Sequence, residues 1–272
     1  MIELTCDKKQ TLKEFTENNC AQASFCWSYL LKNKEIKFNG KKVGADIRLD
    51  EGDQVRYYLT PKQEAKPAFY VVYKDKNVLI VDKESGVNSE AVFAELKRRE
   101  GNACAFIHRL DRNTRGLMAF ALTEKAEREL LSAFKEKRVR KKYHALCFGT
   151  FQKQSEVLTA YLKKNEEKAL VTIFDTPVKG SEKIVTEYRV LQTDGETKKV
   201  EITLHTGKTH QIRAHLSHVG CPIVGDMKYG DASKNKAKNA ARQCLVAKEL
   251  CFTSNGELAY LNNKNFTSRF DV

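Results

Sequence analysis

Strand and helix patterns follow one another irregularly from Ala68 to the C-terminus, and this irregular order limits the folds open to the chain. The run Asn77–Asp82 is rich in valine and isoleucine and predicts a buried strand. Ser89–Arg99 has helical periodicity and begins with a serine where a helix cap belongs. A doubly wound parallel sheet needs a regular β-α-β alternation, which is missing here. We therefore expect an α+β fold with a mixed, largely antiparallel sheet.

The same patterns assign the other elements of this region. Strands are predicted at Phe106–Asp111, Leu117–Leu122, Tyr143–Phe148 and Lys199–Leu204. A helix capped by Thr123 follows the second of these strands. Another helix is predicted over Thr209–Val219, with Val219 on its apolar face and Arg213 on a different face.

The beginning of the chain indicates a small domain of its own. One helical pattern begins at Leu12, and a second one runs through Trp27. Strand-like runs follow at Glu35–Phe38 and Gln54–Leu59. A segment with two of the four prolines comes next and indicates a linker. We therefore expect a small domain at residues 1–60, a linker at residues 61–67 and a larger domain at residues 68–272.

The charge of the chain favours a polyanionic partner. There are 48 Lys and Arg residues against 35 Asp and Glu residues, a net charge of +13. RNA, DNA, an acidic membrane surface and a merely basic surface all remain open on this ground. The eight cysteines form no CxxC pair, which is typical of a reducing cytoplasm and not of a disulfide framework or a zinc site. No apolar run approaches the length of a membrane span.

The segment Phe106–Leu122, FIHRLDRNTRGLMAFAL, places an acid among cations. On a strand, Arg109 and Asp111 share one face, and Arg112 and Arg115 follow in a loop. Guanidinium groups keep a neighbouring carboxylate ionised, and an ionised carboxylate acts as a nucleophile or a base. A structural Arg–Asp pair that fixes the turn is the alternative interpretation.

HRLDRNTRGL within this segment resembles the active-site motif H-R-L-D-x-x-T-S-G-L of the RluA-type pseudouridine synthases. The resemblance implies that Asp111 is the catalytic aspartate and that Arg109 is its partner. Arg115 takes the place of the family's serine, which leaves the acid in place. NVLIVDKESGV at residues 77–87 resembles the family's first motif, which ends in K-P-x-G, with Glu84 in place of the proline.

Two later segments resemble the same family. VRKKYHALCFG at residues 139–149 implies that Tyr143 is the active-site tyrosine, whose ring can stack on a flipped base. VEITLHTGKTHQIRAHLSHVGCPIVGDMKYG at residues 200–230 resembles T-G-R-T-H-Q-I-R-x-H-L and the later G-D-x-x-Y-G, with Lys208 in place of an arginine. This segment implies that Arg213 reaches the catalytic aspartate.

The last of these segments also contains two patterns that are similar to other kinds of site. TGKT at residues 206–209 is similar to part of a phosphate-binding loop, but Ile202 stands where that loop needs glycine. His210 and His215 do not have the i, i+4 spacing of a helical zinc pair. We therefore expect no metal, and we expect these two histidines to make structural hydrogen bonds.

Basic residues on both sides of the proposed linker are candidates for RNA contacts. The order of elements over residues 10–60 resembles an S4-like RNA-binding domain, although a solvated lysine-rich hairpin would give the same lysines. KEKRVRKK at residues 135–142 and KNKAKNAAR at residues 234–242 suit phosphate contacts, although such runs are often solvated surface. The predicted RNA-binding residues are Lys32, Lys34, Lys37, Lys41, Arg112, Arg115, Lys135, Arg138, Arg140, Lys142 and Lys208.

Taken together, the motifs predict an RNA pseudouridine synthase that isomerises uridine in a structured RNA, with ribosomal RNA favoured over transfer RNA. Asp111, Arg109, Tyr143 and Arg213 are the expected catalytic residues. The family resemblance implies no cofactor, and we expect a cytoplasmic monomer that does not bind a membrane. The alternative is a catalytically inactive RNA-binding protein that has kept the fold.

Overall fold

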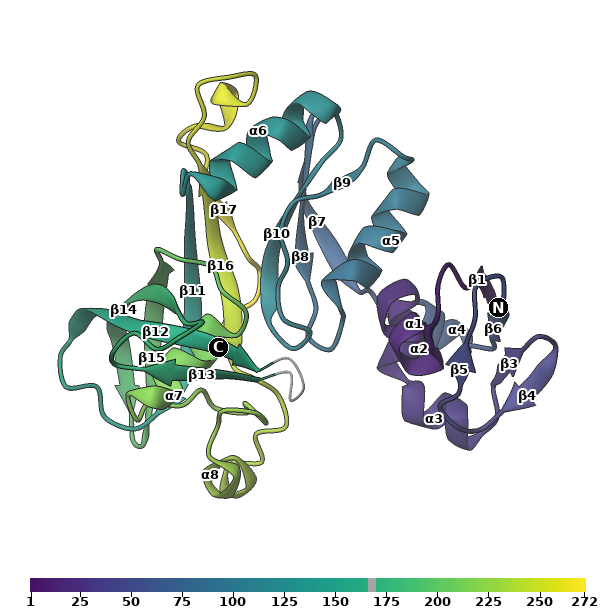
Figure 1. Ribbon diagram of the computed structural model, residues 1–272, viewed down its shortest axis with the longest axis horizontal. Helices are drawn as coiled ribbons and strands as arrows, with labels where there is room; N and C mark the ends of the chain where they lie inside the picture. Colours follow the sequence, from purple (N-terminus) through teal and green to yellow (C-terminus); the bar gives the residue numbers. More distant parts are fainter. Residues whose placement is uncertain (166–169) are drawn as a thin grey trace. The chain divides into compact units, whose positions relative to one another are not determined.

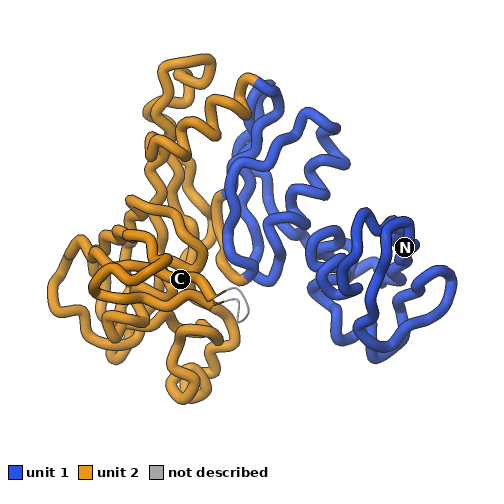
Figure 2. The backbone as a smooth tube through the Cα atoms, viewed as in Figure 1, with its two compact units in different colours: residues 1–112, 118–124 blue, residues 113–117, 125–272 orange. Residues whose placement is uncertain are grey.

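The structure is a computed structural model that describes residues 1–165 and 170–272. It consists of two compact units (Figure 2). The first unit holds residues 1–112 and 118–124, and the second holds residues 113–117 and 125–272. Strand β10 (Arg115–Ala121) begins in the second unit and ends in the first.

The N-terminal segment, residues 1–60, belongs to the first unit and has a core of its own around Leu12, Phe15 and Leu30. An antiparallel sheet has the order β1-β6-β3-β4 (Figure 1). Its strands are β1 (Ile2–Thr5), β6 (Gln54–Tyr57), β3 (Ile36–Phe38) and β4 (Lys41–Val43). The other elements are the β2 (Gln10–Thr11) and β5 (Arg48–Leu49) pair and the helices α1 (Leu12–Asn19), α2 (Ala21–Phe25) and α3 (Trp27–Lys32).

Both helical patterns expected near Leu12 and Trp27 are helices. Helix α1 begins with a capping box, in which the Thr11 side chain accepts from the Glu14 amide and the Glu14 side chain accepts from the Thr11 amide. The segment expected to be a linker contains a short helix, α4 (Pro61–Glu64), which begins with the same type of cap. The three-part division of the chain stays a prediction.

The rest of the first unit is a short sheet and one long helix. Its strands are β7 (Phe69–Lys74), β8 (Val78–Lys83), β9 (Ala105–Phe106) and the second half of β10. The order is β10-β8-β7, and β9 pairs with β10. All six residues of β8 are buried, as expected from the apolar run that forms it. Helix α5 (Ser89–Glu100) contacts β9 and also α1.

Two expectations for this region were wrong. The strand predicted up to Asp111 ends at Phe106, because side chains bind the backbone beyond that point. Ser89 Oγ donates to the Leu110 carbonyl at 2.8 Å and accepts from the Leu110 amide at 2.9 Å. Ser89 is consequently not the cap of α5. That position belongs to Asn88, whose side chain makes no capping hydrogen bond.

The second unit is dominated by long antiparallel strands. Their order is β13-β12-β14-β15-β11-β16, followed by the first residues of β10. The strands are β11 (Val139–Phe148), β12 (Ser155–Asn165), β13 (Leu170–Phe174), β14 (Glu182–Asp194), β15 (Thr197–Leu204), β16 (Leu245–Phe252) and β17 (Phe266–Thr267). Only the short β10–β16 pair is parallel among the strand pairs of the described residues in this unit. The expected α+β fold with a mixed, largely antiparallel sheet is confirmed.

The second unit also contains helices. They are α6 (Glu124–Lys135), α7 (Gln211–His218), α8 (Ala232–Ala237) and a 3-10 helix at Ala259–Leu261. Of these, α7 contacts β13 and β14. Helix α7 is shorter than predicted, because His210 has a left-handed backbone with φ of 54°. Val219, which was expected on the apolar face, is exposed. Arg213 is buried, and the prediction made no statement about its burial. No helix in the described ranges is long and apolar enough to cross a membrane.

Candidate active site

In the first unit, a buried lysine fixes the backbone beside Asp111. Lys83 Nζ donates to the carbonyl oxygens of Glu84 at 3.0 Å, Val87 at 2.9 Å and Arg112 at 3.1 Å. The residue is fully buried. Burial lowers the pKa of Lys83 to about 7, although the negative charge of Asp111 acts in the opposite direction. The end of β8 is thereby tied to the residue that follows Asp111.

Arg109, the expected partner of Asp111, extends to the side of helix α5. Its guanidinium forms an ion pair with Glu90 at 3.1 Å, and its side chain is largely exposed. The hydrogen bonds between Ser89 and Leu110 hold the backbone between Arg109 and Asp111. Ser89 and Glu90 are thus two neighbours of the motif that sequence reasoning did not assign to the site.

In the second unit, Arg213 on α7 forms a buried ion pair. Its Nε donates to Asp226 Oδ2 at 2.6 Å and its Nη2 donates to Asp226 Oδ1 at 2.9 Å. The Asp226 carboxylate also accepts from the amides of Lys228 and Tyr229. Burial alone would raise the pKa of Asp226, but the hydrogen bonds and charge of Arg213 hold it below its ordinary value. The guanidinium is therefore fixed in place by two parallel hydrogen bonds.

Tyr229 extends this cluster. Its ring lies 5.2 Å from the guanidinium carbon of Arg213, and its hydroxyl is 2.8 Å from His210 Nδ1. The same hydroxyl accepts from the Val171 amide at 2.9 Å. His215 is 3.0 Å from Thr186 Oγ1, so both histidines make the expected hydrogen bonds. No group of three or more potential metal ligands occurs in the described part of the chain.

The end of the active-site motif, residues 113–117, is held tightly within the second unit. Thr114 Oγ1 accepts from the buried Gln243 side chain at 3.0 Å. Gly116 has φ of 114°, and a β-carbon there would lie 2.3 Å from the Ala247 carbonyl oxygen, so no other residue fits. Arg115, which replaces the family's serine, packs its guanidinium 4.8 Å from the centre of the Phe270 ring. Phe270, near the C-terminus, therefore provides a packing partner for the arginine that replaces the family's serine.

Tyr143 lies on β11 and is largely buried. The pairing of β11 with β16 shifts its register between Lys142 and Tyr143, and such a bulge re-aims the side chains beside it. Tyr143 and Arg213 belong to the second unit, whereas Asp111 belongs to the first. The contact of Arg213 with Asp111 that the resemblance implies stays a prediction.

The predicted RNA-binding residues differ in how they are engaged. Several are exposed cations, namely Lys32, Lys34, Lys41, Lys135 and Arg140. Others are held by partners within the protein. These are Lys37 over the Tyr58 ring, Arg112 with Glu17, Arg115 with Phe270, Arg138 with Glu136, Lys142 with Glu201, and Lys208 with Glu182. Within the described ranges the five exposed cations form no ion pair, although Arg140 Nη2 donates to Cys251 Sγ at 3.2 Å, so they can meet phosphates without breaking one.

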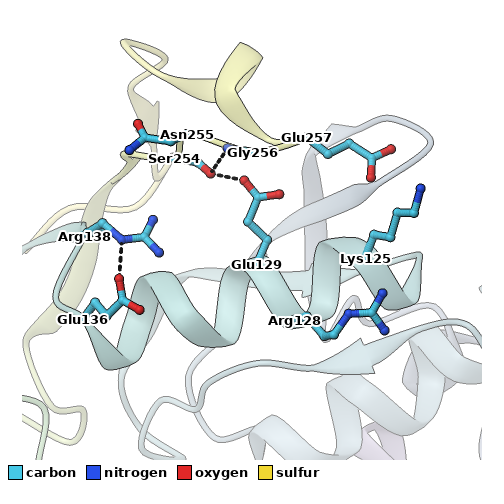
Figure 3. A pocket seen from close by; sticks show the side chains of 9 residues that line it. All are labelled: Lys125, Arg128, Glu129, Glu136, Arg138, Ser254, Asn255, Gly256 and Glu257. Atoms are coloured by element: carbon cyan, nitrogen blue, oxygen red, sulfur yellow. Dashed lines mark hydrogen bonds and ion pairs between the residues drawn. The ribbon is translucent and has the colours of Figure 1, made fainter.

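A cavity of about 640 Å³ lies between α6 and the segment 254–257 (Figure 3). Lys125 and Arg128 extend from the helix along the wall of the cavity, and Glu129 accepts a hydrogen bond from the Ser254 hydroxyl. Arg138 is paired with Glu136 at another edge. Acids and bases are balanced around the cavity, and none of the four expected catalytic residues lines it.

Comparison with known proteins connects this geometry to a family. The family model for RNA pseudouridylate synthase matches residues 67–218, which is more than half of the chain. The chain belongs to the RNA pseudouridylate synthases. Within that family it is an RluA-type enzyme, an isomerase that acts on RNA.

Named relatives of this synthase come from bacteria and from human. The ribosomal large subunit pseudouridine synthase C of Vibrio cholerae is 33% identical over 226 residues, which cover 74% of this chain and 70% of that protein. The enzyme of the same name from Rickettsia conorii is 30% identical over 251 residues, covering 80% and 82%. The solved structure of human RNA pseudouridylate synthase domain containing 1 is similar with a TM-score of 0.61 and 29% identity, covering 70% of this chain and 80% of that one.

Sequence reasoning missed the residues that support the site. Lys83 and Asp226 lie inside motifs that were recognised, K-P-x-G and G-D-x-x-Y-G, so their positions were a usable signal. Glu17 carries no such signal. It pairs with Arg112, which lies 95 positions away in the chain.

Proposed function

We propose that this synthase converts uridine to pseudouridine in ribosomal RNA, with Asp111 as the catalytic carboxylate. The observation that carries the assignment is the support around Asp111, where buried Lys83 binds the carbonyl of the next residue. The names of the bacterial relatives favour a ribosomal substrate. Modification of ribosomal RNA would take place in the cytoplasm.

The chemistry needs one carboxylate and no change of oxidation state. Asp111 promotes cleavage of the bond between uracil N1 and ribose C1′, either by attack on C1′ or by removal of the C2′ proton. In both routes the bonding electron pair leaves with the uracil, which turns so that C5 bonds to C1′. In the first route this step breaks the bond between the Asp111 carboxylate and C1′, and in the second route C2′ takes back its proton. The C5 proton is then lost, which restores the aromatic base. A closed pocket keeps the detached base near the ribose.

The target uridine must leave its stack before it can react. Tyr143 is proposed to stack on the flipped base, and Arg213 to supply a fixed positive charge at the site. The exposed cations Lys135 and Arg140 are proposed to bind phosphates beside the site, where RNA contacts are mainly electrostatic. The N-terminal segment is proposed to bind RNA in the manner of an S4-like domain, through exposed lysines such as Lys41.

The test is Asp111→Asn, which keeps the shape of the side chain and removes its charge. We expect pseudouridine formation in a ribosomal RNA fragment to fall by roughly 10³-fold or more, as when a reacting group is removed. RNA affinity is expected to stay the same or to improve, because an anion has left a basic surface. Glu51→Gln, at an exposed position, is the matched control.

Turnover of Asp111→Asn close to that of the wild type would contradict the role of this residue. A wild-type enzyme that modifies transfer RNA and not ribosomal RNA would overturn the substrate. A wild type that binds RNA but modifies neither would overturn the enzymatic function.

A further inference from the structure

The residue directly after the proposed catalytic carboxylate is held by the N-terminal segment. The Arg112 guanidinium forms an ion pair through Nη1 with Glu17 on helix α1. Its Nη2 is 3.5 Å from Ser24 Oγ, at the limit of a hydrogen bond. The Glu17 side chain is mostly buried, with 19% of its surface exposed, so the ion pair is less screened by solvent than a surface pair.

The same arginine is fixed to the end of the first family motif. Its carbonyl accepts from the Gly86 amide at 2.9 Å and from Lys83 Nζ at 3.1 Å, while its Nε donates to the Gly86 carbonyl at 3.3 Å. Backbone and side chain of Arg112 therefore bind one loop, residues 83–87. A shift of the guanidinium would therefore displace the peptide that joins Arg112 to Asp111.

The N-terminal segment also contacts this loop and the helix that follows it. Asn88 Nδ2 donates to Asn18 Oδ1 at 3.1 Å, and α1 packs on α5. The Phe25 ring lies beside Gly86, where an added β-carbon would be 3.9 Å from it. The loop is thus bounded on one side by the N-terminal segment and on the other by the peptide that carries Asp111.

We propose that Glu17 is a positioning residue for the reaction, through which the N-terminal segment orients the loop at Asp111. This proposal rests on the proposed function of Asp111. The segment then contributes to kcat and not only to RNA affinity. The opposite role would be an inhibitory one, in which Glu17 occupies the place of an RNA phosphate on Arg112. The two roles predict opposite effects when the charge of Glu17 is removed.

The experiment is Glu17→Gln in the full chain, measured by steady-state pseudouridine formation on a ribosomal RNA fragment. We expect kcat to fall about tenfold and KM to change by less than about twofold, since coupling within a network of this kind is moderate. Glu17→Asp, which keeps the charge, is expected to recover most of the loss. The matched control is Glu3→Gln, because Glu3 pairs with Arg56 at 2.9 Å within the N-terminal segment.

A second measurement separates this proposal from the proposed function. Hydrogen exchange of the Gly86 amide is followed in the enzyme without RNA, because this amide donates to the Arg112 carbonyl. We expect exchange roughly tenfold faster in Glu17→Gln and unchanged in Glu3→Gln. A faster reaction or a lower KM in Glu17→Gln would overturn positioning in favour of inhibition. An unchanged kcat with unchanged exchange would overturn it altogether. If the wild type modified no RNA, the proposed function would fail, and the exchange result would still decide whether Glu17 orders the loop.

Discussion

Among the described residues, each compact unit buries one cation near its part of the family motifs, and the two cations are stabilised differently. Lys83 in the first unit donates to three backbone carbonyl oxygens. Arg213 in the second unit donates to the carboxylate of Asp226. The carbonyl dipoles offset only part of the free-energy cost of burying the charge, so the pKa of Lys83 falls to about 7. A paired guanidinium keeps its charge at any pH at which the protein folds.

The difference indicates two uses of a buried charge. Lys83 orders the backbone around it, and because its pKa is about 7 the ammonium group can lose its proton near neutral pH. Arg213 presents a permanent charge in a fixed orientation, which suits a group that must meet an anion or a polar base. Two predictions test this comparison and a third tests the contact of Arg115 with Phe270, and they are ordered from the largest expected effect to the smallest.

The first prediction concerns Asp226→Asn, which keeps an oxygen for the amides of Lys228 and Tyr229 but removes the counter-charge of Arg213. We expect the free energy of unfolding to fall by about 3–5 kcal/mol, because one buried charge is left uncompensated. Denaturant titration at constant pH measures the loss. Asp175→Asn, which breaks the exposed pair of Asp175 with His218, is the control and should cost far less.

A double variant sharpens this result. Arg213→Met combined with Asp226→Leu removes both charges, so it should be more stable than Asp226→Asn alone. If Asp226→Asn proved as stable as the wild type, Arg213 would not depend on this carboxylate, and the contrast with Lys83 would fail.

The second prediction concerns Lys83→Met, which removes the donor of three carbonyl groups. We expect a loss of about 2–3 kcal/mol near pH 7. The pKa of Lys83 is about 7 in the folded protein, while an exposed lysine has a pKa of about 10.4. The unfolded chain therefore binds more protons between these values, and wild-type stability gains from Lys83 as the pH rises above 7.

The methionine variant lacks this gain, so the gap in unfolding free energy between wild type and variant should widen from pH 6 to pH 9. The comparison requires denaturant titrations of both proteins at each pH. A gap that stays constant or narrows would show that the pKa of Lys83 is not lowered, and Lys83 would then resemble Arg213 after all.

The third prediction concerns Phe270→Leu, which keeps an apolar side chain against Arg115 but removes the aromatic face. We expect a loss of about 0.5–1 kcal/mol in unfolding free energy, the range for a partly exposed cation–π contact. Val272→Ala at the end of the chain serves as the control. A larger loss than that of Lys83→Met would contradict the order of effects and place the main support of the turn in the C-terminal segment.

The sequence predicted those parts of the fold that local patterns determine. The apolar run at Asn77–Asp82 became the buried strand β8, and the helical patterns at Leu12 and Trp27 became helices. The strand expected up to Asp111 failed, because Ser89 binds the backbone of Leu110 from a distant helix. The pattern of residues 106–111 carries no information about Ser89, which lies 21 positions from Leu110 in the chain.

The site was predictable to the extent that motifs name its residues. Asp111, Arg109, Tyr143 and Arg213 follow from recognised patterns, and their catalytic roles stay predictions. The burial of Arg213 could not be foreseen from helical periodicity, because its counter-ion Asp226 lies beyond the end of the helix. The pairing of Glu17 with Arg112 depends on the tertiary fold alone.

The chain crosses between the two units at three points, after residues 112, 117 and 124. Each unit therefore contains a short stretch of polypeptide flanked on both sides by residues of the other. No single cut in the gene yields two products that correspond to the units. A two-fragment version of the enzyme would have to be divided inside at least one unit, and that unit would be complete only after the two fragments had assembled.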